Sequence, residues 1–134
     1  MEVLSLFKSK QSAVDLNISA FTASQTYSFN NGLVYTLDAT STAMTSILFT
    51  DIPTTPNQSY IFTFILKPNV ASSAFYLKPN TNFVTINGIS TALFGLSNII
   101  LPQTFTYLIQ QITLINISTT VTPSFIALTS VSGY

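Results

Sequence analysis

Apolar and polar side chains alternate along most of this 134-residue chain, and this alternation limits the folds open to it. In the clearest run every second position is aromatic or aliphatic and shares one face: Tyr60, Phe62, Phe64 and Leu66. A period of two is that of a β-strand, whose successive side chains point to opposite faces. No stretch combines the apolar spacing of an amphipathic helix with helix caps. The sequence therefore predicts an all-β protein.

Turn signals divide the chain into eight to nine short strands. Asn31-Gly32 and Asn87-Gly88 are dipeptides that supply the positive φ of tight hairpins, and residues 53–57 form a proline-rich turn. Strands separated by turns at intervals of about 8–12 residues are typical of sandwiches and barrels. We therefore predict an antiparallel β-sandwich or a jelly-roll-like barrel.

Residues 1–11 differ from the remainder. They hold Glu2, Lys8 and Lys10, three of the eight charged side chains, and no strand pattern begins before about Ala13. We predict an N-terminal arm over residues 1–11 and one β-sandwich domain over residues 12–134. Four apolar side chains of the arm are the candidate docking residues on a neighbouring subunit: Val3, Leu4, Leu6 and Phe7.

The composition excludes several classes of function. Only 6% of the residues are charged, the formal net charge is zero, and His, Cys and Trp are absent. A neutral chain lacks the basic surface that binds nucleic acid. Without His or Cys it lacks the commonest general base, thiol nucleophiles and thiolate metal sites. We expect no enzyme activity, no metal and no cofactor.

Asp38 and Asp51 are the two carboxylates of the sequence that are candidates for an acid–base pair. Both stand at turn positions, where Asp commonly bonds its own backbone, so a catalytic pair is the less favoured interpretation. No loop carries the dense acidic spacing of a calcium site. The most apolar stretch, residues 98–115, contains Pro102 and several glutamines, so we expect no membrane span, and the N-terminus lacks the pattern of a signal peptide.

Aromatic and basic residues leave alternatives open. The core is the default interpretation for most phenylalanines, among them Phe62, Phe64 and Phe83. A carbohydrate-binding platform is an alternative for Tyr27, Tyr35, Tyr60, Tyr76 and Tyr107, although a core or subunit interface is favoured for the tyrosines. Tyr60, Tyr76 and Asn57 are the candidates for surface recognition. Lys67 and Lys78 each follow a leucine and precede Pro-Asn. Two similarly capped strand ends are favoured there over a paired basic site.

One segment resembles a known group of proteins. Residues 48–66, LFTDIPTTPNQSYIFTFIL, are similar to a pattern of small β-sandwich virion surface proteins, the capsid decoration or cement proteins and fibre heads of aquatic phages and other aquatic viruses. Residues 25–30 and 84–88 are similar in character. Phe94 stands where that pattern often carries tryptophan.

The resemblance implies a virion structural protein, most readily a capsid cement or decoration protein that stabilises the particle by packing on neighbouring subunits. Its partners would be the major capsid protein or other virion proteins, and it would form a homo-oligomer, a trimer by analogy. It would be made in the host cytoplasm and lie on the particle exterior, without nucleic acid or membrane partners. The alternative is a fibre-tip or receptor-binding module that holds a glycan through Tyr60, Tyr76 and Asn57.

Overall fold

The structure, a computed structural model, describes residues 13–16, 24–39, 46–68, 76–79, 81–100 and 105–134. This part of the chain is built of β-strands joined by turns and by two short 3-10 helices, η1 (Phe29–Asn31) and η2 (Leu96–Asn98). The predicted all-β class is confirmed. The nine described strands are β1 (Ala13–Leu16), β2 (Ser24–Ser28), β3 (Val34–Ala39), β4 (Ser46–Thr50), β5 (Ser59–Pro68), β6 (Phe83–Ile86), β7 (Ile89–Phe94), β8 (Leu108–Asn116) and β9 (Phe125–Gly133).

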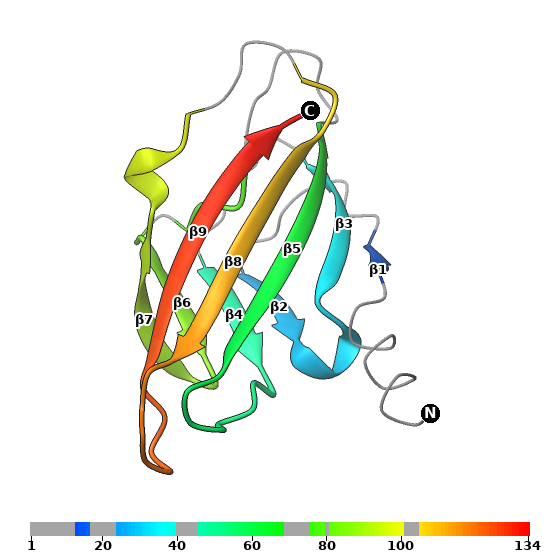
Figure 1. Cartoon of the computed structure of the whole chain (residues 1–134). Coiled ribbons are helices and arrows are strands. Elements are labelled where there is room, and N and C mark those ends of the chain that lie inside the picture. Colours follow the sequence, from blue (N-terminus) through cyan, green and yellow to red (C-terminus); the bar gives the residue numbers. More distant parts are fainter. Residues whose placement is uncertain (1–12, 17–23, 40–45, 69–75, 80, 101–104) are drawn as a thin grey trace.

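All nine strands belong to one curled sheet in the order β1-β3-β5-β8-β9-β7-β6-β4-β2. Figure 1 shows β5, β8 and β9 as one wall, with β2, β4 and β6 lying behind it. Strands β9 and β7 are the neighbours at which one half of the sheet passes into the other. The curl lets the two halves bury their apolar faces against each other.

The first six strands alternate between the two halves of the sheet. β1, β3 and β5 are parallel neighbours in one half, and β2, β4 and β6 are parallel neighbours in the other. Only afterwards does the chain turn back, with β7, β8 and β9 making antiparallel pairs to β6, β5 and β8. Because five of the eight pairings among the described strands are parallel, the predicted antiparallel sheet is wrong and the sheet is mixed. Alternating polarity encodes which face is buried and not which strand is the neighbour.

One of the two predicted hairpins is present. Asn87 (φ 50°) and Gly88 (φ 84°) link β6 to β7 as a two-residue turn with positive φ at both positions. Asn31-Gly32 is not a hairpin, because β2 pairs with β4 and β3 with β5. There, η1 and Gly32 (φ 108°) carry the chain from one half of the sheet to the other.

Aromatic rings from both halves meet in the core. The Phe49 ring of β4 lies 4.7 Å from the Phe62 ring of β5, and the Tyr27 ring of β2 lies 4.8 Å from that of Phe64. Tyr35 packs edge-on against Tyr27 at 4.9 Å. Edge-to-face pairs of this kind add about 0.5–1.5 kcal/mol each beyond the area that they bury.

The two buried tyrosines differ in their hydroxyls. The Tyr35 hydroxyl donates to the main-chain oxygens of Ser28 (3.1 Å) and Gly32 (3.0 Å). The Tyr27 hydroxyl is buried without a hydrogen-bond partner in the described part of the chain. Burial, followed by the nearby Tyr35, raises the pKa of Tyr27 far above its usual range, and burial also raises the pKa of Tyr35.

Candidate functional site

The side of the sheet that faces away from the core carries a row of apolar side chains, which we call the apolar row. It crosses four adjacent strands: Ile61 of β5 pairs with Thr113 of β8, Thr113 with Leu128 of β9, and Leu128 with Phe94 of β7. The exposed fractions are 46% for Ile61, 41% for Leu128 and 55% for Phe94. Large apolar side chains gathered on one exposed sheet face are typical of an interaction surface.

Further apolar side chains extend this row. Ile115 pairs with Ile126 in the next outward-facing register of β8 and β9, and both are half-buried. On β6, Phe83 pairs with Ala92, two residues before Phe94 on the same face of β7. Phe83 is 47% exposed, so its prediction as a core residue is wrong: the core side of β6 is taken by Val84 and Ile86.

The rest of this outer face combines polar side chains with half-buried apolar ones such as Ile65 and Ile109, and it is almost uncharged. Beyond the apolar row, Thr63, Gln111 and Ser130 form the next outward-facing row across β5, β8 and β9. No charged residue follows Lys78 in the sequence, so β6 to β9 contribute none. Apart from the end of β5, where Lys67 is exposed, the face can therefore be covered by another surface without burying an unpaired charge, which is the costly event in polar interfaces.

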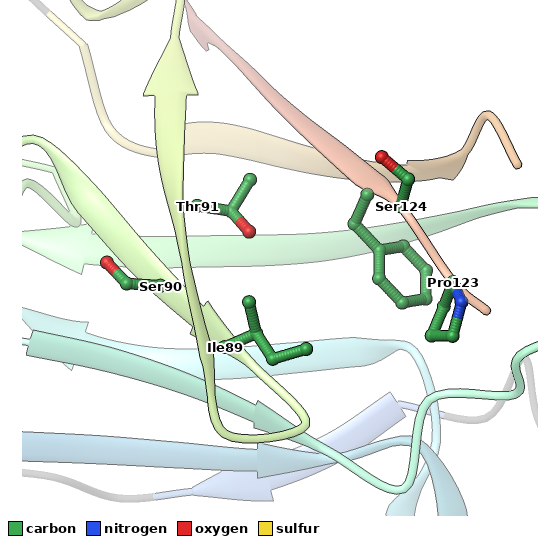
Figure 2. A pocket seen from close by; sticks show the side chains of 6 residues that line it. Ile89, Ser90, Thr91, Pro123 and Ser124 are labelled. Carbon is green, nitrogen blue, oxygen red and sulfur yellow. The ribbon is translucent and has the colours of Figure 1, made fainter.

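A pocket of about 280 Å³ opens beside this face, where β7 and β9 separate. We call it the seam pocket, and six residues line it: Ile89, Ser90, Thr91, Pro123, Ser124 and Phe125. Figure 2 shows Ile89 and Thr91 leaning toward Pro123 and Ser124, the two residues that precede β9, while Ser90 points the other way. The lining combines apolar groups with hydroxyls and holds no ionisable side chain, so it suits an uncharged occupant.

Buried amides hold the strands around these surfaces, and sequence reasoning did not single them out. Gln110 of β8 is fully buried, accepts the Leu77 N–H at 2.7 Å and donates to the Leu77 carbonyl at 2.9 Å and to the Thr129 hydroxyl at 3.0 Å. It thereby pairs with Leu77 as a strand backbone would. A glutamine at a core-facing position of an otherwise apolar alternation is the signal that could have revealed it.

At the other end of β8, the side-chain amide of Asn116 likewise binds main-chain groups of neighbouring segments. Its side chain donates to the main-chain oxygens of Thr54 and Thr55 and accepts the N–H groups of Ser118 and Ser124. The residue is fully buried. This amide therefore fixes the turn before β5 and the turn before β9.

The three predicted recognition residues are not brought together. The Tyr60 ring packs against Phe29 at 5.1 Å, at the edge of the core, and Asn57 lies exposed in the turn before β5. Tyr76 precedes Leu77, which is bound beside Gln110, whereas Tyr60 pairs with Leu114. Four residues of β8 separate those two points (114 − 110 = 4), roughly 13 Å along a strand.

Two other tyrosines are exposed side by side. Tyr107 and Tyr134 exchange main-chain hydrogen bonds of 2.9 and 2.8 Å beyond the ends of β8 and β9. The residues next to them, Leu108 and Gly133, form an inward-facing pair, so these tyrosines lie on the outer face. They are 42% and 68% exposed.

The main chains of Asp38 and Asp51, the two candidate catalytic residues, lie toward opposite ends of the sheet. Asp38 pairs in register with Lys67 near the end of β5, while Asp51 begins the turn that leads into Ser59, the first residue of β5. Those ends are eight residues apart (67 − 59 = 8), roughly 25 Å of strand. Asp51 has φ 57° and accepts a hydrogen bond of 2.6 Å from the Ser28 hydroxyl, as a turn residue does. Paired catalytic carboxyls lie within about 10 Å, so these two do not form such a pair.

Of the remaining predicted sites, some lie outside the described residues and some lie within them. Val3, Leu4, Leu6 and Phe7, with the predicted arm over residues 1–11, lie outside the described residues. Lys67 and Lys78 are both exposed, the first at the end of β5 and the second beside Leu77. Within the described ranges, no three acidic residues gather as a metal-binding group, and no helix is long and apolar enough to cross a membrane.

No protein family model, curated protein or solved structure matches this chain.

Proposed function

We propose that this chain is a structural protein that works inside an assembly and packs its outer face against neighbouring protein subunits. The observation that carries the proposal is the apolar row, whose exposed Ile61, Leu128 and Phe94 come from β5, β9 and β7, on a face with few charges. Covering such side chains stabilises an assembly by about 25 cal/mol for each Å² of apolar surface removed from water. Surfaces of monomers rarely leave apolar side chains gathered in this way.

The setting that we propose is the exterior of a virus particle, as a capsid cement or decoration protein. The resemblance of residues 48–66 to virion surface proteins supports this setting, with the major capsid protein or a second copy of this chain as the neighbour. In that role the curled sheet serves as an open β-sandwich, a description that the Phe49–Phe62 contact between its halves supports. A neutral face suits packing on several different neighbours, because it demands no complementary charge.

The oligomeric state in solution tests the proposal. We expect self-association that grows over protein concentrations of about 1–500 µM, measured by analytical ultracentrifugation. Leu128→Lys and Phe94→Lys place a charge in the apolar row and should yield monomers with an unchanged melting temperature. Thr26→Lys, at an exposed position of β2 in the other half of the sheet, is the matched control and should associate like the original chain.

A chain that stays monomeric at the highest concentration, and whose lysine variants leave particle incorporation unchanged, would contradict the proposal. Incorporation is read as the amount of protein that sediments with virus particles when the original chain and each variant are compared.

A second candidate role is the glycan-binding module, and the exposed pair Tyr107 and Tyr134 favours it. Paired aromatic rings with polar tips can pack on sugar rings. A glycan array separates the two roles: saccharide binding that Tyr107→Ala removes and Tyr60→Ala preserves would support the module, and an array without binding would exclude it.

A further inference from the structure

The two halves of the sheet are joined by a short ladder of two residue pairs. β7 and β9 pair only through Leu93 with Ala127 and Phe94 with Leu128, a constant offset (127 − 93 = 34). The same offset would place Thr91 opposite Phe125 (125 − 91 = 34), but that pairing is not made. The seam pocket occupies the space where it would lie.

The main-chain groups of β7 that border this space follow from its pairing with β6. The Leu93 N–H donates to the Asn82 carbonyl at 2.9 Å, so the backbone of Leu93 faces β6. Because hydrogen-bonding direction alternates along a strand, the backbone groups of Ser90 and Ala92 face the opposite way, toward β9. These are the groups that another strand would bind.

The same reasoning applies to β9. The Ser124 carbonyl accepts the Ile117 N–H at 2.9 Å and therefore faces away from β7. The backbone of Phe125, the next residue, faces β7. A bridge between Thr91 and Phe125 would need two hydrogen bonds. The Ala92 N–H would donate to the Phe125 carbonyl, and the Phe125 N–H would donate to the Ser90 carbonyl. The two strands do not form this bridge, so the two hydrogen bonds are not both made. Two strand edges thus face each other across the pocket.

The side chains of the pocket alternate as those of a strand pair do. Phe125 packs against the core, and it shares its face of β9 with the buried Ala127 and Thr129. Thr91 lies on the same face of β7 as the buried Leu93. Ser90 and Ser124 fall on the other, outward face. An occupant that spans the pocket therefore meets the Phe125 ring and the Thr91 side chain on its inner side and the two serine hydroxyls on its outer side.

We propose that the seam pocket receives an extended, uncharged peptide segment of a partner protein, which pairs with β7 and β9 as an added strand. Facing strand edges present alternating N–H and C=O groups, and an extended peptide main chain offers the complementary series. The alternating walls favour apolar side chains inward and hydroxyl side chains outward. Charged side chains are disfavoured, since the pocket offers no partner for a charge. This surface is distinct from the apolar row, and the proposal does not depend on self-association through that row.

The test uses the full chain and capped nonapeptides in which valine alternates with threonine or serine, a length that matches β8 and β9. Binding is followed by amide NMR shifts and by hydrogen exchange. We expect shifts that centre on Ser90, Ala92, Ser124 and Phe125. We also expect exchange of the Ala92 and Phe125 amides to slow at least tenfold at saturation, because both become hydrogen-bonded.

Two variants close the pocket, Thr91→Trp and Ser124→Trp, and either should weaken peptide binding at least tenfold. Ser124 is exposed beside a turn, so its variant is expected to fold even where Thr91→Trp does not. Ser130→Trp, an exposed serine on the outer face of the same strand, is the matched control and should bind as the original chain does.

Three results would overturn the proposal. The first is that no neutral peptide, at millimolar concentration, shifts the amide NMR signals of the residues that line the seam pocket. The second is equal binding of peptides whose hydroxyl residues are replaced by lysine or glutamate. The third is a seam response to neutral trisaccharides but not to peptides, which would assign the pocket to sugars.

Discussion

Removing one oxygen atom from the core should make this protein more stable. Tyr27 is 1% exposed, and its hydroxyl has no hydrogen-bond partner in the described part of the chain. Its ring packs against Tyr35 and Phe64 at 4.9 and 4.8 Å. Tyr27→Phe keeps the ring and those contacts and removes only the buried hydroxyl.

The magnitude follows from the cost of an unsatisfied buried group. Leaving a buried donor unpaired costs about 1–3 kcal/mol. Allowing for a small void where the oxygen stood, we expect Tyr27→Phe to raise the free energy of unfolding by about 1 kcal/mol. For a chain of this size that corresponds to a melting temperature higher by about 3 °C.

Tyr35→Phe is the matched control. Its hydroxyl donates to the Ser28 and Gly32 carbonyls, so the same change leaves both acceptors without their donor. We expect it to lower the free energy of unfolding by about 1–2 kcal/mol. The two variants differ from the original chain by the same atom, and the opposite signs isolate the hydrogen bonds.

Alkaline pH provides a second readout of Tyr27. Burial raises its pKa above the ordinary value of 10.0, so above about pH 10 the unfolded chain releases a proton that the folded chain keeps. The unfolded state then binds fewer protons, and stability falls as pH rises, by up to about 1.4 kcal/mol per pH unit for each such group. Tyr27→Phe should make the fall between pH 9 and 11 less steep.

Urea unfolding at pH 7 and across the alkaline range, followed by circular dichroism, measures these effects. A Tyr27→Phe variant that is destabilised by about 1 kcal/mol or more would refute the reasoning, since it would mean that the hydroxyl is bonded.

Two further substitutions probe the joints of the sheet by the same urea method. Gly95 (φ 99°) lies so near Thr129 that a Cβ would overlap the Thr129 main-chain oxygen, so Gly95→Ala should cost about 2–4 kcal/mol. Gly88→Ala, with φ 84° and open space around it, should cost only about 1 kcal/mol, and equal losses for the two would contradict the close approach. Gln110→Leu leaves the Leu77 main chain unpaired and should cost about 2–4 kcal/mol, whereas Gln111→Leu on the outer face should change stability little.

Side-chain alternation predicted the faces of individual strands well. Phe62, Phe64 and Leu66 are buried in β5 and Ile61 is exposed, as a period of two requires. It failed at Phe83, because residue type alone does not reveal which face of a strand meets the core when both faces carry apolar side chains. The same ambiguity concealed the apolar row, whose members look like core residues in the sequence.

The sequence did not reveal which strands pair with each other in the sheet. Asn31-Gly32 and Asn87-Gly88 carry the same local preference for positive φ, yet only the second closes a hairpin. The difference lies in long-range partners: β4 and β5, contributed by later segments, pair with β2 and β3 and hold them in opposite halves of the sheet. Local propensity cannot report contacts between segments twenty or more residues apart.

The candidate sites follow the same division. The lack of charge after Lys78 and the absence of His and Cys are properties of the sequence alone, and they restrict the chain to neutral surfaces. Where those surfaces lie was decided by the tertiary structure. The apolar row exists because four strands align in register, and the seam pocket exists because β7 and β9 pair over two residues and then separate. Composition and alternation act residue by residue, whereas a surface is made by residues that only the folded sheet brings together.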